Sequence, residues 1–117
     1  MAGSSWKKSP PELIKAFGAV AGRYPQLEQR KMFGYRAAFL AGNMTTALHE
    51  DRWIVRLAEP DRAELLATAG AAPFEPMPGR PMREYVVLPA GIVADPGATA
   101  GWVERAIAYA RTLPPKR

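Results

Sequence analysis

Four prolines in a run of nine residues constrain this chain more than any other feature of its sequence. The run, residues 73–81, reads Pro-Phe-Glu-Pro-Met-Pro-Gly-Arg-Pro. Each proline fixes its backbone φ angle and lacks an N–H donor, which excludes a helix and a central strand. We therefore predict a stiff loop over this run. Residues 82–88 then read as a strand, which Pro89 ends.

Three segments carry the signals of helices. Ser9 and Glu12 predict a capping box at the start of a first helix over residues 10–22. A second helix is predicted over residues 60–70, between a first-turn proline and a terminating glycine. Asp95 is expected to cap a third helix, which two consecutive prolines stop near the C-terminus. The apolar stripe of this third helix is expected to consist of Trp102, Ala106, Tyr109 and Leu113.

Between the first two predicted helices, apolar residues recur at every second position, which is typical of strands. We predict strands over residues 30–35, 36–40, 44–49 and 53–57. Gly34 is expected to mark a bulge or a close backbone approach within the first of them. Met44, Thr46 and Leu48 are expected to share one face of their strand. The turns are short, so neighbouring strands must run antiparallel.

The order of these elements predicts the fold class. A helix, three or four strands, a second helix, a late strand and a third helix indicate an α+β domain. Its two layers are expected to be an antiparallel sheet of four to five strands and the three helices. The 117 residues fit one domain, which we place at residues 9–113, with residues 1–8 as a flexible tail and residues 114–117 as a second tail.

The composition of the chain excludes several classes of functional site. The chain has no cysteine, which excludes a disulfide framework, thiolate metal sites and a cysteine nucleophile. No apolar run is long enough to cross a membrane, so we expect a soluble cytoplasmic protein without a membrane partner. The net charge of +5 suggests nucleic acid, but Lys7, Lys8, Lys116 and Arg117 supply four basic charges from the tails. The remaining 12 basic and 11 acidic residues leave the body near neutral.

Residues for catalysis are not recognisable in the sequence. His49 is followed by Glu50 and Asp51, but adjacent strand residues point to opposite faces and cannot converge on a metal ion. We expect His49 to be a solvated residue at the end of a hairpin. No serine has the context of a nucleophile, and no glycine-rich phosphate loop occurs. The sequence therefore predicts a protein that is not an enzyme, with no catalytic, cofactor-binding or metal-binding residues.

Two arginines, Arg80 and Arg83, stand where the proline-rich loop meets the late strand. They could hold a carboxylate or a phosphate of a partner through paired hydrogen bonds. The alternative, which we favour, is that they pair inside the protein with Glu75 or Glu84.

Aromatic residues offer a second kind of contact. Tyr85, with Phe33 and Tyr35, could form a stacking platform for single-stranded nucleic acid. The alternative, which is commoner for aromatic residues, is that Phe33 and Tyr85 pack beneath a helix. The candidates for binding a partner are Lys31, Arg36, Arg80, Arg83 and Tyr85.

Residues 31–34, Lys-Met-Phe-Gly, resemble the Lys-Met-Phe-Gly-Gly signature of the TfoX N-terminal domain family, with Tyr35 in place of the second glycine. Further matches follow in the same order: Asp51-Arg52, Pro60-Asp61-Arg62, Pro73-Phe74, Met82-Arg83-Glu84-Tyr85 and Trp102-Val103. The resemblance covers residues 10–113. It implies a two-layer fold with an antiparallel sheet, of the kind likened to secretion chaperones.

The resemblance also implies kinship with the TfoX/Sxy regulators of natural competence in bacteria, in which a helical C-terminal domain follows this one. No such domain follows here, so a stand-alone domain is expected. We therefore expect a non-catalytic regulatory or protein-interaction module, linked by the resemblance to transcription regulation.

Its expected partner is another protein of unknown identity. The alternative is an accessory protein that binds nucleic acid through a small basic cluster, with an affinity that falls steeply with salt. That cluster consists of Arg30, Lys31, Arg36, Arg80 and Arg83. A homodimer is a further expectation, because a short antiparallel sheet leaves an edge to protect.

Overall fold

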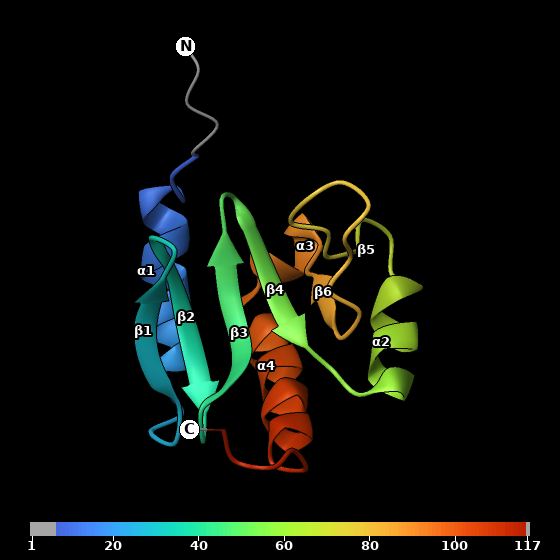
Figure 1. Ribbon diagram of the computed structural model, residues 1–117. Coiled ribbons are helices and arrows are strands. Elements are labelled where there is room, and N and C mark those ends of the chain that lie inside the picture. The colour runs from blue at the N-terminus through green and yellow to red at the C-terminus, as the bar shows by residue number, and fades with distance from the viewer. Residues whose placement is uncertain (1–6, 117) are drawn as a thin grey trace.

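The structure is a computed structural model of the protein and describes residues 7–116. Its elements are α1 (Pro11–Ala21), β1 (Glu28–Met32), β2 (Tyr35–Leu40), β3 (Asn43–His49), β4 (Arg52–Arg56), α2 (Glu59–Leu66), β5 (Ala72–Pro73), β6 (Tyr85–Val87), α3 (Ala90–Val93) and α4 (Pro96–Ala110). The strands form an antiparallel sheet in the order β1-β2-β3-β4-β6-β5. Figure 1 shows α1 and α4 behind this sheet, where the two helices contact each other.

The predicted α+β fold is confirmed. The late strand β6 pairs with β4 beside the early strands, as expected, but it spans only Tyr85–Val87 and not the predicted residues 82–88. Residues 7–116 form six strands and four helices, more than the sequence predicts. The additional elements are β5, of two residues, and α3, of four residues. Segments this short show no readable apolar period.

The turn of the first hairpin differs from the prediction. It consists of Phe33 and Gly34, whose φ angles are 54° and 84°. Two consecutive positive φ angles are typical of the tight turn that joins paired antiparallel strands. Gly34 is therefore a turn residue and not a bulge, and β1 ends at Met32. The predicted strand over residues 30–35 was wrong because it ran through this turn.

The bulge lies one hairpin later. β2 and β3 change register after Ala38, so that Phe39 pairs with Met44 and Thr45 is an additional residue in β3. A bulge of this kind changes which face the following residues occupy. Met44 packs against the cluster on the opposite side of the sheet from Leu48, so the shared face predicted for them was wrong.

The helix starts were predicted with mixed success. Asp95 caps α4 as expected, because its Oδ1 accepts hydrogen bonds from the N–H groups of Gly97 (3.0 Å) and Ala98 (3.2 Å). The capping box of α1 is not formed. The hydroxyl of Ser9 instead donates to the carbonyl oxygen of Glu50 at 2.6 Å, which ties the start of α1 to the β3–β4 turn.

Both later helices also differ from their predictions. α2 ends at Leu66, well before Gly70. α4 buries Thr99, Ala100, Val103, Ala106, Ile107 and Ala110. Trp102 and Tyr109 lie at the margin of this face because polar partners hold them there. The guanidinium of Arg105 lies 4.3 Å from the Trp102 ring centroid, and the Tyr109 hydroxyl donates to Glu84 at 2.8 Å.

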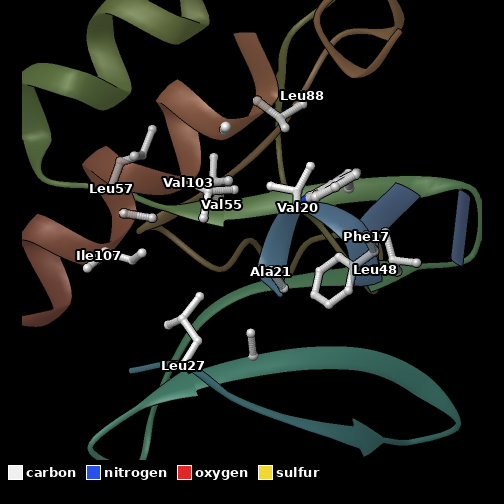
Figure 2. Close-up of a cluster of buried hydrophobic side chains, with 14 of the residues drawn as sticks. Phe17, Val20, Ala21, Leu27, Leu48, Val55, Leu57, Leu88, Val103 and Ile107 are labelled. Atoms are coloured by element: carbon white, nitrogen blue, oxygen red, sulfur yellow. The ribbon is translucent and has the colours of Figure 1, made fainter. Parts of the chain in front are cut away.

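The main core lies between the sheet and the helices α1 and α4 (Figure 2). Phe17 of α1 packs against Trp53 of β4, with ring centroids 5.1 Å apart, and both side chains are buried. The indole N–H of Trp53 donates to the hydroxyl of Thr46 at 2.8 Å. This hydroxyl donates in turn to the carbonyl oxygen of Ile54 at 2.7 Å. Within residues 7–116, no buried side-chain nitrogen or oxygen lacks a hydrogen-bond partner.

The other face of the sheet is apolar as well. Its buried residues are Ala37, Phe39, Ala47, Ile54, Phe74 and Tyr85. No helix of residues 7–116 contributes to this second cluster. Phe74 of the proline-rich loop belongs to this cluster, and Met82, just after the loop, packs against it. An antiparallel sheet commonly has one packed and one solvated face, so this sheet differs in burying a second apolar cluster on its other face.

Candidate functional site

A groove with a volume of about 730 Å³ lies on this second face. The sheet residues Ala37, Ala47 and Ile54 line it. It is also lined by Phe33 from the β1–β2 turn and by Met77 from the proline-rich loop. Figure 1 shows β2, β3 and β4 between that turn and that loop, so these strands form the floor and the two connections form the walls.

The groove collects most of the methionines of the chain. Of the five methionines in the sequence, Met32, Met44, Met77 and Met82 all line it. Methionine is flexible and polarisable, and surfaces that bind apolar segments of varied shape use it for that reason. This concentration makes the groove an adaptable apolar surface.

Two large apolar side chains of the groove are strongly exposed. Phe33 is 79% exposed and Met77 is 59% exposed, and they belong to different walls. Phe33 therefore does not pack beneath a helix, and that expectation was wrong. Exposed apolar residues that gather around a concave surface mark a site of interaction.

One end of the groove is more polar. There the imidazole of His49 lies between the rings of Tyr35 and Phe74, with both pairs of centroids 5.2 Å apart. A guanidinium nitrogen of Arg52 lies 3.0 Å from Nδ1 of His49. Arginine can only donate, so Nδ1 must accept and the proton of the neutral ring sits on Nε2.

The surroundings of His49 favour this neutral form. Burial lowers the pKa of His49, the positive charge of Arg52 lowers it further, and Glu50 opposes both effects. His49 is thus a half-buried, stacked residue and not the solvated histidine that the sequence suggested. Because Nδ1 of His49 accepts a hydrogen bond from Arg52, the imidazole is poorly placed to take a proton from a substrate.

Basic side chains adjoin both walls of the groove. Arg36 lines it, and Lys31 stands directly opposite Arg36 across the first hairpin. On the other wall, Arg80 is bridged to Met77, and Arg83 follows Met82 in the chain. We call Lys31, Arg36, Arg80 and Arg83 the basic rim. All four are exposed, and no ion pair of theirs occurs within residues 7–116.

The internal pairing that we favoured for Arg80 and Arg83 is not formed. Glu84 instead accepts hydrogen bonds from Nε of Arg56 at 2.6 Å and from the hydroxyl of Tyr109 at 2.8 Å. Burial acts to raise the pKa of Glu84, but the hydrogen bonds from Tyr109 and Arg56 lower it overall. These contacts link β4, the loop before β6 and α4, so Glu84 has a structural role.

Tyr85 does not take part in the stacking platform that the sequence left open as the less common alternative. Tyr85 is only 8% exposed, and its hydroxyl donates to the carbonyl oxygen of Met44 at 3.2 Å. Burial raises the pKa of the Tyr85 phenol, as expected for a ring inside the second cluster. Arg30 lies 4.0 Å from the ring centroid of Phe39 and 3.8 Å from Glu28. The structure thus uses Tyr85 and Arg30 internally.

The floor residues of the groove were not among the predicted site residues, although the sequence contains a signal for them. Apolar residues occur in adjacent pairs along three strands, where one buried face would need only every second residue. The pairs are Ala37-Ala38, Ala47-Leu48 and Ile54-Val55. Adjacent apolar residues in a strand indicate that both faces of the sheet are covered or bound.

Other kinds of site are not found in the part of the chain that the structure describes. Within it, no three His, Asp or Glu side chains lie close enough together to hold a metal ion. Likewise, none of its helices is both long enough and apolar enough to cross a membrane. What the groove can do chemically is bind an apolar surface and attract negative charge to its rim.

Comparison with known protein families matches residues 19–110 to the TfoX N-terminal domain, whose members are regulatory domains. Searches of curated proteins and of solved structures find no match. The matched range contains every strand of the sheet, and both walls of the groove. It spans most of the 117 residues, and the chain therefore belongs to the TfoX N-terminal domain family.

Proposed function

We propose that this protein is a non-catalytic regulatory module that works in the cytoplasm by binding a protein partner in its groove. The observation that carries the proposal is the pair of exposed apolar side chains, Phe33 and Met77, on the two walls of a groove with an apolar floor. Membership of a regulatory domain family is consistent with this role.

The polar groups of the groove support binding over catalysis. His49 and Glu50 both face Arg52, at 3.0 Å and 3.5 Å, so each is already engaged inside the protein. A general base needs a free lone pair within hydrogen-bond reach of the proton that it removes. The exposed apolar side chains of Phe33 and Met77, in contrast, are available to a partner without any rearrangement of hydrogen bonds.

Site-specific photo-crosslinking in living cells tests this proposal. One variant of the protein carries a photoreactive amino acid at position 33. A control variant carries it at position 15, where Lys15 is exposed on α1 behind the sheet. We expect a defined protein adduct from position 33 that position 15 does not give. The purified partner should then bind the unmodified protein and bind a groove variant much more weakly. Equal adducts at both positions would remove the groove from the proposal.

Nucleic acid remains the second candidate, because the basic rim is exposed and has no ion pairs within residues 7–116. The groove beside the basic rim favours a protein partner over nucleic acid. Phosphate binding requires clustered positive charge, and a floor of alanine, isoleucine and methionine adds nothing to it. With Tyr85 buried, the aromatic stacking that single strands require is also weakened.

A further inference from the structure

We propose that the segment which occupies the groove is an amphipathic helix whose apolar face is flanked by acidic residues. This inference rests on the proposed function and adds the chemistry of the partner. Three features of the structure support it: the layering of the sheet, the charge of the rim and the width of the molecule.

The layering favours a helix. On one face of the sheet, α4 packs against β3 and β4. The opposite face of the same strands is the floor of the groove. Layered folds cover an apolar sheet face with helices or with a second sheet, and α4 already covers the opposite face of these strands as a helix. Ala47 and Ile54 are only 5% and 2% exposed, so a partner helix on this face would contact chiefly the exposed side chains of Phe33 and Met77 on the two walls.

The rim sets the charge of the partner. Lys31 and Arg36 adjoin one wall and Arg80 and Arg83 the other, and none has a carboxylate partner in residues 7–116. The acidic group that lines the groove, Glu50, already faces Arg52 at 3.5 Å. Complementary charge across an interface speeds encounter and fixes orientation. Acidic residues on both sides of an apolar stripe meet this requirement.

The dimensions of the molecule indicate the length of the partner helix. The two shorter axes of the molecule are 29 Å and 28 Å. A helix rises 1.5 Å per residue, so about 18 residues span this width. Apolar residues recurring at helical spacing then reach the floor between Phe33 and Met77.

Fluorescence anisotropy with synthetic peptides tests the inference. The probe is a labelled peptide of about 18 residues with leucines at helical spacing and glutamates beside them. One control peptide has the same composition with the leucine spacing scrambled, and another has lysine in place of each glutamate. Labelled single-stranded and duplex oligonucleotides complete the set. We expect binding of the acidic amphipathic peptide, with the scrambled peptide about tenfold weaker or worse.

Charge reversal locates the binding. The double variant Arg80→Glu and Arg83→Glu should weaken binding of the acidic peptide about tenfold. A matched double variant, Lys15→Glu and Arg111→Glu, changes the net charge equally behind the sheet and should leave binding unchanged. All four substituted residues are exposed and have no ion pair in residues 7–116, so both variants should fold, and circular dichroism checks this.

The inference is overturned by no binding of the acidic peptide, by equal loss of binding in both double variants, or by preference for the lysine peptide. Oligonucleotides that bind more tightly than the peptide also overturn the inference, if the double variant Arg80→Glu and Arg83→Glu abolishes their binding. That result favours nucleic acid as the partner. A specific crosslink at position 33 together with any of these results keeps the groove as a protein site and rejects only the acidic helix.

Discussion

Phe33 occupies a turn position that suits asparagine, yet it is the most exposed large apolar side chain of the described residues. The substitution Phe33→Asn creates Asn-Gly, the dipeptide that tight hairpin turns of this geometry prefer. It also removes one wall of the groove. The variant should therefore gain stability and lose binding, which separates the role of this residue in the fold from its role in the site.

The magnitude follows from exposure and backbone geometry. Phe33 is 79% exposed, so its removal gives up only about 0.5 kcal/mol of the 1.5–3 kcal/mol that full burial of phenylalanine contributes. Its φ angle of 54° is a left-handed conformation. That conformation costs most residues about 1–2 kcal/mol, and asparagine relieves a part of this cost. We expect a net stabilisation of about 0.5 kcal/mol, or about 2 °C in melting temperature.

Ala41 provides a matched control. Ala41 and Gly42 form the turn between β2 and β3 with φ angles of 50° and 83°, nearly those of Phe33 and Gly34. Ala41 does not line the groove. Ala41→Asn should stabilise the protein by a similar amount in thermal unfolding. In the peptide titration it should bind normally, whereas Phe33→Asn should bind about tenfold or more weakly.

A clear result can refute this reasoning. If Phe33→Asn lowers the free energy of unfolding by more than about 1 kcal/mol, Phe33 packs more closely than its exposure indicates. If both variants bind the peptide equally well, Phe33 is not an anchor of the groove.

Three further predictions concern the core, the histidine and the methionines. Leu65→Ala removes the buried side chain of α2 and should cost about 3 kcal/mol in chemical denaturation; the neighbouring Leu66→Ala, at a 40% exposed position, should cost less than about 1 kcal/mol. Folding lowers the pKa of His49, so protonation favours the unfolded state and stability should fall as the pH drops below about 6.5. His49→Gln should reduce this loss of stability, measured as the change in melting temperature between about pH 7 and pH 5. If the change is the same in both proteins, other groups cause the loss of stability. Hydrogen peroxide, which transfers an oxygen atom to the thioether and leaves water, should oxidise the exposed Met77 before the half-buried Met44; peptide mapping by mass spectrometry gives the order.

Local sequence signals predicted the elements that depend on nearby residues. The Asp95 cap, the antiparallel pairing of β3 with β4 and the late strand after the proline-rich loop all follow from residues close together in the sequence. They were correct because the backbone conformations of proline and glycine and the capping of free N–H groups are local effects. The family signature, residues 31–34, was readable for the same reason.

Two of the errors arose where a distant residue competed for a local group. Ser9 was expected to cap its own helix, but the carbonyl oxygen of Glu50 takes its hydrogen bond. Glu84 was expected to pair with a nearby arginine, but Arg56 and Tyr109 reach it from other elements. No pattern in a single sequence shows which of several donors lies nearest in space.

The sequence by itself determined the α+β class, the antiparallel strands, the family and the supply of exposed basic residues. Only the tertiary structure decided that four methionines and Phe33 line one groove, that the rim arginines stay unpaired within residues 7–116, and that Tyr85 is buried. The physical reason is that local conformation depends on neighbours in the chain. A binding surface, in contrast, depends on which faces remain uncovered after the sheet, the helices and the proline-rich loop have packed together.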